Sequence, residues 1–399
     1  MIRISIFKLL YLFVFKITLF LILIYSSHKS YCQSERIKVG AEQTHLYINK
    51  IQSSKIAIVA NQTSRLKSGD NYIHLIDTLI SLNIDIKKVF SPEHGFRGIA
   101  DAGEKVEDGI DVKTGLPIIS LHGKNRKPSK KQLEDVDIVI FDIQDVGARF
   151  YTYISTMHLV MEAVAENNKK FFVFDRPNPN GHYVDGPVLE KEFKSFVGLH
   201  PVPIVHGMTV GEFAMMINDE GWLENGIKTN LQVIPIKNYS RKIIYKLPEK
   251  PSPNLPNKKS INLYPSLCLF EQTNVSIGRG TDMQFQIFGN PEWNNKLFSF
   301  TPKSTFGAKF PKHKDVKCYG FDLREQPFLN QINLEWLIYA YSNSEDKSSF
   351  FYKGFSRLAG NNKLQKQIEN GETIKEIRNS WKKDLKKFKK LRENYLLYN

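Results

Sequence analysis

The chain has 399 residues, too long for one small domain and long enough for two. Hydrophobic residues make up 41% of it and charged residues 24%, which excludes a wholly disordered or fibrous protein. Its three cysteines are too few for a disulfide scaffold or a zinc-ribbon protein. The formal net charge of +15 suits an acidic partner: nucleic acid, an anionic surface or a carboxylate-bearing polymer.

The first 32 residues have the order of a secretory signal peptide. Arg3 and Lys8 precede an apolar run over residues 9–25, and small and polar residues follow, with a predicted cleavage before Gln33. An uncleaved membrane anchor is the alternative, because the run is nearly long enough to span a bilayer. Cleavage removes four basic residues and no acidic one, which lowers the net charge from +15 to +11. We expect an exported, periplasmic or extracellular protein that meets the membrane only through this segment, has envelope glycans as acidic partners and binds no nucleic acid.

Residues 33–250 alternate short β-rich runs with helical periodicity. Strands are predicted at residues 55–60, 86–90, 118–121, 136–141, 171–174 and 231–236, and helices at 72–83, 153–167 and 209–220. This alternation favours parallel strands joined by right-handed crossovers. The predicted fold class is therefore α/β, with a Rossmann-like parallel-sheet domain at residues 33–250 carrying the catalytic groups.

The next segment, residues 250–256, holds three prolines and is interpreted as an ordered linker. A smaller α+β domain is expected over residues 251–399, with helices at 335–341, 363–369 and 374–390. Six lysines at residues 382–390 are interpreted as a solvated helix face. The sequence leaves open whether Cys268 and Cys318 form a disulfide.

Polar side chains follow four predicted strands, at the sheet edge where open parallel sheets bind ligands. They lie in residues 61–64 (NQTS), 91–98 (SPEHGFRG), 142–153 and 175–181 (DRPNPNG). Neither G-x-G-x-x-G, a P-loop, G-x-S-x-G nor H-E-x-x-H occurs, so we expect no nucleotide cofactor, other cofactor or metal. Carboxylates among arginines, amides and aromatic rings are typical of acid–base chemistry on a sugar.

Glu93 is the predicted general acid, because a tight loop at a strand end would desolvate its carboxyl. His94 is the candidate that tunes it. A structural role is the alternative, in which Glu93 caps a helix or pairs with Arg97.

Asp142 and Asp145 are candidates for the second catalytic group. Asp145 is equally compatible with capping the following helix or bracing Arg149. The sequence does not decide between them.

The candidate binding residues are those whose side chains can hydrogen-bond sugar hydroxyls, stack on a sugar ring or hold a substrate carboxylate. Asp175 is also suited to a structural pair with Arg176, and the residues beyond 270 reach the crevice only if the two domains close over it. The set comprises Asn61, Gln62, Arg97, Arg149, Tyr151, Asp175, Arg176, Asn178, His206, Glu271, Asn274 and Arg279.

These motifs belong to a longer ordered series that also includes HGMTVGEFA (206–214), PSPNLP (251–256), YPSLCLFE (264–271), TNVSIGRGT (273–281) and YLLY (395–398). The series resembles the exo-β-N-acetylmuramidase family, formerly a domain of unknown function. The resemblance implies a Rossmann-like N-terminal domain, a smaller C-terminal domain and an active site near their junction. It implies release of terminal, non-reducing β-1,4-linked N-acetylmuramic acid (MurNAc) from peptidoglycan fragments such as MurNAc-GlcNAc.

The resemblance also implies that Glu93 is the catalytic carboxylate, and the lactyl carboxylate of MurNAc would be a ligand for the arginines. Gln272, Asn290 and Tyr239 stand where family members usually have Gly, Ala and Trp, which bears on substrate range. A non-catalytic peptidoglycan-binding protein using the same crevice is the alternative. An esterase or amidase is disfavoured by the missing serine and metal motifs.

Overall fold

The computed structural model describes residues 11, 13, 14, 16–18, 36–93, 95–97, 108–294 and 296–399. Residues 38–399 form one compact unit, and residues 1–37 are a separate one. Of the predicted signal peptide only six residues are described, all helical, and the rest of that prediction lies outside the described residues. No helix within the described ranges is both long and apolar enough to cross a bilayer.

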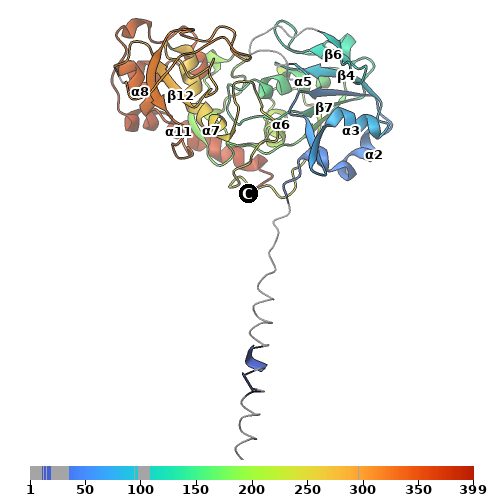
Figure 1. Cartoon of the computed structure of the whole chain (residues 1–399). Helices are drawn as coiled ribbons and strands as arrows, with labels where there is room; N and C mark the ends of the chain where they lie inside the picture. Colours follow the sequence, from blue (N-terminus) through green and yellow to red (C-terminus); the bar gives the residue numbers. More distant parts are fainter. Residues whose placement is uncertain are drawn as a thin grey trace, which may run out of the picture. The chain divides into compact units, whose positions relative to one another are not determined.

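A seven-stranded sheet organises the first part of the compact unit (Figure 1). Every pairing in it is parallel except that of β5 with β6. The order reverses around β1, which pairs with β4 on one side and β7 on the other, so the predicted Rossmann-like fold is confirmed. Across the sheet the strands are β11 (Asn230–Ile234), β8 (Lys170–Phe174), β7 (Ile138–Asp142), β1 (Ile56–Ala60), β4 (Ile86–Ser91), β6 (Pro117–Ser120) and β5 (Gly109–Ile110).

Both faces of the sheet are buried, as parallel sheets require. Along β1, Ala57 and Val59 face one hydrophobic core, whereas Ile56, Ile58 and Ala60 face the other. Helices α5 (Tyr153–Glu166) and α6 (Val210–Asp219) pack into the first core, and α2 (Ile48–Ile51) and α3 (Leu75–Ser81) into the second. The buried sheet therefore fixes the positions at which the polar loops after the carboxyl ends of its strands begin.

One predicted helix is wrong at its start. The helix predicted at residues 72–83 begins only at Leu75, because residues 71–74 form β3 (Asn71–His74) in a hairpin with β2 (Arg65–Ser68). Tyr72 and Ile73, which fit a helical spacing, lie 43% and 40% exposed on this hairpin. A second antiparallel pair, β9 (Asp185–Val188) with β10 (Pro203–Val205), was not predicted.

The second part of the unit is α+β, as expected. A three-stranded antiparallel sheet orders β12 (Ile287–Asn290), β14 (Cys318–Asp322) and β13 (Ser299–Phe300). The helices here are α7 (Lys258–Leu267), α8 (Glu335–Ser342), α9 (Phe355–Ala359), α10 (Lys363–Glu369) and α11 (Ile374–Arg392). The remaining short elements are α4 (Lys130–Leu133), η1 (Gly40–Glu42), η2 (Thr44–Leu46), η3 (Lys191–Phe193), η4 (Glu224–Gly226), η5 (Cys268–Gln272), η6 (Lys347–Ser349) and η7 (Glu393–Tyr395).

Helix α11 carries the lysine-rich run with its lysines exposed, while Trp381 and Phe388 are buried, so the interpretation as a solvated face is confirmed. Cys268 and Cys318 are both buried and free. Residues 250–256 are ordered without helix or strand. The larger hydrophobic core runs through both parts of the unit, from Phe141 in β7 to Phe288 in β12. The domain boundary at residues 250/251 remains a prediction.

The last residues of the chain pack back against the Rossmann-like part. Tyr398 donates its hydroxyl proton to Asp175 Oδ2 at 2.7 Å, and the Leu397 N–H donates to Glu212 Oε1 at 2.7 Å. Asp175 also accepts from the Thr209 hydroxyl and the Gly211 N–H at the start of α6. A side chain predicted to bind sugar therefore anchors the C-terminal residues.

Candidate active site

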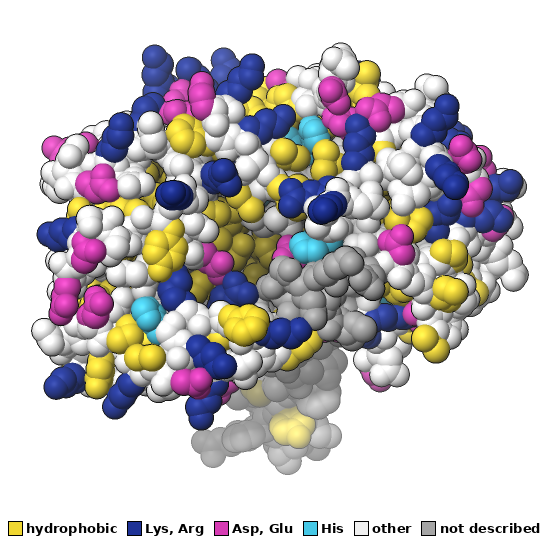
Figure 2. Space-filling view, turned by 90° about the horizontal axis from the view of Figure 1, so that it is seen from above, with side chains coloured by type: hydrophobic (Ala, Val, Ile, Leu, Met, Phe, Trp, Pro, Cys, Tyr) yellow, Lys and Arg dark blue, Asp and Glu magenta, His cyan; other side chains and the backbone are white. Residues whose placement is uncertain are grey.

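A cavity of about 250 Å³ lies where the loop after β4 and the segment before α5 meet residues 252–285. One face of the molecule is hollowed, with hydrophobic side chains on the floor of the hollow and acidic and basic side chains around it (Figure 2). The cavity is lined by Glu93, Phe150, Tyr151, Thr152, Tyr153, Val197, Ser252, Asn254, Leu255, Tyr264, Cys268, Glu271, Gln272, Arg279, Phe285 and Leu358.

Aromatic rings form one wall of the cavity. Tyr264 makes edge-to-face contacts with Phe150 and Tyr151 at 5.4 and 5.8 Å between ring centroids, and a tilted contact with Phe285 at 5.1 Å. Tyr151 also meets Tyr153 edge to face at 4.9 Å. These packed rings give the cavity an apolar wall, and their mutual contacts fix its shape.

The carbonyl of Pro251 fixes the proline-rich segment against this wall. It accepts hydrogen bonds from the hydroxyls of Tyr151 and Tyr153, at 2.7 and 3.3 Å. Gln62 Nε2 donates to the same carbonyl at 3.4 Å and to that of Lys250 at 3.1 Å. Burial raises the pKa of both tyrosines, so the phenols remain protonated donors. Gln62, predicted to bind sugar, positions this segment instead of lining the cavity.

Two carboxylates line the cavity, one from each part of the unit. Glu93 accepts a hydrogen bond from the Thr152 hydroxyl at 3.3 Å. Glu271, on η5, pairs with Arg279, whose Nη1 lies 3.0 and 3.3 Å from its two oxygens. Burial disfavours the charged form of Arg279, but the neighbouring Glu271 raises the pKa of the guanidinium above its ordinary value. The cavity thus combines an acid, an ion pair and an aromatic wall.

The other acids proposed for catalysis lie outside the cavity lining. Asp142, at the end of β7, is fully buried and binds Arg176 through two hydrogen bonds of 2.6 and 2.8 Å. Asp145 Oδ1 accepts from the Gly147 N–H at 2.6 Å, and its Oδ2 has no hydrogen-bond partner among the described residues. Burial raises the pKa of Asp145 to about 7, against the opposing effect of the Gly147 N–H.

Three more predicted binding residues brace the loops. Asn61 Oδ1 accepts from the backbone N–H and the hydroxyl of Thr63. Asn178 Nδ2 donates to the Met208 carbonyl at 2.8 Å. His206 is buried, its Nδ1 accepts from the Met208 N–H, and burial lowers its pKa to about 3, so the ring stays neutral. None of these side chains lines the cavity.

The first-half arginines also have internal partners. Arg97 binds Asp111 through two hydrogen bonds, of 3.1 and 2.7 Å. Arg149 is fully buried and donates to the carbonyls of Pro187, Val202 and Leu358, each at 2.8 Å. Burial lowers the pKa of Arg149 to about 9. These guanidiniums stabilise the fold and do not face the cavity.

Two predicted residues remain. His94 lies outside the described residues. Asn274 does not line the cavity, and its carbonyl accepts from His313 Nε2 at 2.6 Å and from Asn290 Nδ2 at 3.1 Å. Of the three departures from the usual family residues, Gln272 lines the cavity, and Asn290 and Tyr239 do not.

Several lining residues were not singled out from the sequence, although their motifs were. Phe150 and Thr152 flank Tyr151, and Tyr264 lies within YPSLCLFE. Ser252 and Asn254 belong to the segment interpreted as a linker. The available signal was the run of aromatic and hydroxyl side chains at residues 150–153.

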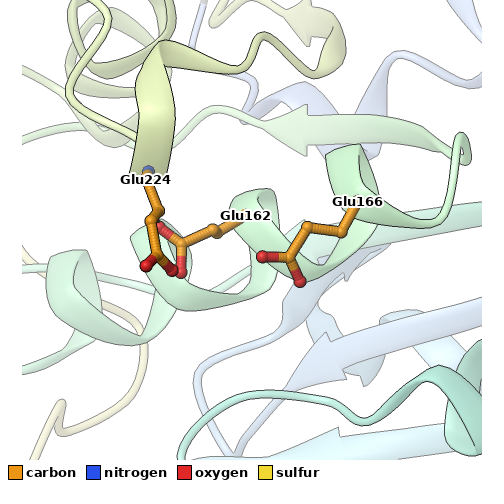
Figure 3. Close-up of side chains that lie close together, drawn as sticks. All are labelled: Glu162, Glu166 and Glu224. Carbon is orange, nitrogen blue, oxygen red and sulfur yellow. The ribbon is translucent and has the colours of Figure 1, made fainter.

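A separate acidic cluster joins Glu162 and Glu166 of α5 with Glu224 of η4 (Figure 3). One oxygen from each lies within 4.8 Å of the others. Lys127 Nζ donates to Glu162 and Glu166 at 2.7 Å each, and Glu162 Oε2 accepts from the Glu224 N–H at 2.8 Å. Burial favours the protonated form of Glu162, but these bonds lower its pKa. The ammonium group of Lys127 therefore offsets one of the three negative charges of this cluster.

Comparisons with known proteins identify the class. Two family models match, described as the N-terminal and C-terminal parts of "Exo-beta-N-acetylmuramidase NamZ", over residues 56–259 and 262–398. The peptidoglycan beta-N-acetylmuramidase NamZ of Bacillus subtilis is 40% identical over 378 residues, covering 88% of this chain and 89% of that protein. The chain is therefore a glycoside hydrolase.

Two solved structures share the fold of this chain. Two crystal structures of DUF1343 family proteins from Bacteroides fragilis have TM-scores of 0.84 and 0.79, at 46% and 30% identity. The matches cover 92% and 91% of this chain, and 99% of each of those chains. The chain belongs to the exo-β-N-acetylmuramidase NamZ family, which confirms the resemblance found in its motifs.

The buried carboxyl of Asp145 predicts a pH-dependent effect of Asp145→Asn. Its folded pKa of about 7 lies above the ordinary 3.8, so its contribution to stability is greatest below about pH 4 and is lost as the pH rises through 7. The variant should therefore gain stability over the wild type from pH 4 to 7, by up to a few kcal/mol. Urea unfolding at several pH values measures this difference. A difference that does not change with pH would contradict the assignment.

Proposed function

We propose that this protein is an exo-acting glycoside hydrolase that releases terminal, non-reducing β-1,4-linked MurNAc from peptidoglycan fragments. The proposal rests on one observation: Glu93 and the Glu271–Arg279 ion pair line the same aromatic-walled cavity. The match to the exo-β-N-acetylmuramidase family supports the substrate and the direction of attack.

Glu93 is the proposed proton donor. It gives its proton to the glycosidic oxygen as the bond from that oxygen to the anomeric carbon breaks. Water then adds to the anomeric carbon, and its proton returns to a carboxylate. Thr152, 3.3 Å from Glu93 Oε2, orients the carboxyl.

Glu271 is the proposed second carboxylate, in place of Asp142 and Asp145. It lines the cavity, whereas Asp142 and Asp145 are buried outside it. Its ion pair with Arg279 holds it in position to stabilise the positive charge that develops on the sugar ring.

Glu93→Gln should abolish most of the turnover and leave the fold intact. The amide cannot donate a proton as an acid does, so hydrolysis of a chromogenic β-glycoside of MurNAc should fall at least about 100-fold. The wild type should release the chromophore from the MurNAc substrate and not from its N-acetylglucosamine (GlcNAc) analogue.

The matched control is Glu190→Gln, which removes a carboxylate that pairs with Lys363 at the surface, 2.7 Å away. It should hydrolyse MurNAc glycosides as the wild type does. Thermal unfolding of both variants checks their folding. If Glu93→Gln retained about a tenth or more of the wild-type rate, Glu93 would not be the acid.

We propose further that the protein is exported and that the apolar segment is a cleaved signal peptide. The order of residues 3–33 and the net charge of +11 after cleavage support this location beside an acidic glycan. Mass spectrometry of the protein from its native envelope should find Gln33 at the N-terminus. An N-terminus within residues 1–10 in a membrane fraction would identify an uncleaved anchor instead.

A further inference from the structure

A second cavity, of about 360 Å³, adjoins the first across the Glu271–Arg279 ion pair. Glu271 and Arg279 line both cavities. The proposed bond cleavage does not use the second one. It is lined otherwise by Val275, Ser276, Ile277, Phe310, Pro311 and Lys312.

The lining of this second cavity carries an excess positive charge. Arg279 is paired with Glu271, but Lys312 has no carboxylate within ion-pair distance among the described residues. Its Nζ donates to the carbonyl of Phe270 at 3.0 Å and to that of Thr273. An ammonium group has three N–H donors, so these two bonds leave the third, and the ring of Tyr352 lies 5.2 Å from the Nζ atom.

Burial makes this charge costly. The pKa of Lys312 is lowered to about 8, chiefly by burial, with Glu271 opposing the shift and Arg279 adding to it. An anionic group bound beside Lys312 would stabilise its charged form. The cavity therefore favours an acid over a neutral group of the same size.

The rest of the lining suits a short apolar arm. Val275 and Ile277 are buried, whereas the ring of Phe310 is 90% exposed at the edge of the same cavity. A large apolar side chain this exposed gains from any apolar group that covers it. Cationic and apolar lining together match a carboxylate on a short hydrocarbon branch.

We infer that the second cavity is the subsite for the acidic lactyl arm of MurNAc, whose ring lies in the first cavity, with Lys312 and Arg279 holding the carboxylate. The inference rests on the proposed function and deepens it, because it names the cations that distinguish MurNAc from GlcNAc. GlcNAc lacks the lactyl arm, so the free energy of this contact sets how much more tightly the protein binds MurNAc than GlcNAc. These cations replace Arg97, Arg149 and Arg176 in that role.

Equilibrium binding of monosaccharides tests the subsite without any turnover. We would titrate the full chain with MurNAc, GlcNAc and the methyl ester of MurNAc by calorimetry. The wild type should bind MurNAc at least about 10-fold more tightly than either neutral sugar. Lys312→Met should reduce this preference to about 3-fold or less. Lys314→Met, a matched change at a 45% exposed lysine outside both cavities, should leave it unchanged.

A pair of charge variants at Phe310 covers the case in which Lys312→Met does not fold. The exposed ring contributes little to the fold, so Phe310→Glu and Phe310→Lys should both unfold like the wild type. Phe310→Glu should weaken MurNAc binding and leave GlcNAc binding unchanged, because only MurNAc is an anion. Phe310→Lys should retain or strengthen the MurNAc preference.

Three results would overturn the inference: no measurable MurNAc binding, equal affinity of the wild type for MurNAc and GlcNAc, or an unchanged preference in both Lys312→Met and Phe310→Glu.

A failure of this inference can be distinguished from a failure of the proposed function. MurNAc preference without hydrolysis of MurNAc glycosides would refute the hydrolase proposal alone. Hydrolysis without MurNAc preference would refute the subsite alone.

Discussion

A buried ion pair between Asp142 and Arg176 joins the carboxyl ends of β7 and β8, two neighbouring strands of the large sheet. Both side chains are almost fully buried at the carboxyl ends of neighbouring strands, and their two hydrogen bonds are 2.6 and 2.8 Å long. Removing one partner would leave an uncompensated buried charge, which is strongly destabilising. Neither side chain lines the cavity, which lies between the loops after β4 and before α5 and residues 252–285. Tyr151, Tyr153 and Gln62 hold the Pro251 carbonyl and so fix the proline-rich segment against the aromatic wall of the cavity.

The charged side chains named above fall into two groups, those with internal partners and those that line the cavities. Carboxylates and guanidiniums of the Rossmann-like part satisfy one another or backbone carbonyls, as Arg149 does with three carbonyls. Three of the charged side chains that line the cavities, Glu271, Arg279 and Lys312, belong to the α+β part of the unit. The Rossmann-like part contributes Glu93. In this account the sheet positions the acid, and the second part supplies the groups that select the sugar.

Much of the fold was predictable because its signals are local. Buried strands such as residues 136–141 and the capped helix at Thr209 are visible in a short window of sequence. The position of Glu93 at the cavity was also predictable, since a carboxyl in a tight loop after a strand is a local pattern, whereas its role in catalysis stays a prediction. The roles of Asp175 and Pro251 were not, because Tyr398 and Tyr151 reach them across 223 and 100 residues of chain. The partners of the arginines could not be predicted for the same reason. A sequence shows that Arg176 is cationic, but it does not show that Arg176 forms an ion pair with Asp142.

The central claim is that Glu93 acts on a glycosidic bond held in this cavity, and a crystal structure of Glu93→Gln with a MurNAc-GlcNAc disaccharide tests it most directly. The account predicts the MurNAc ring against the wall formed by Tyr151 and Tyr264, with the glycosidic oxygen within hydrogen-bond distance of the residue 93 amide. A disaccharide bound elsewhere, such as in the hollow lined by residues 246–258, or with its glycosidic oxygen out of reach of residue 93, would contradict it.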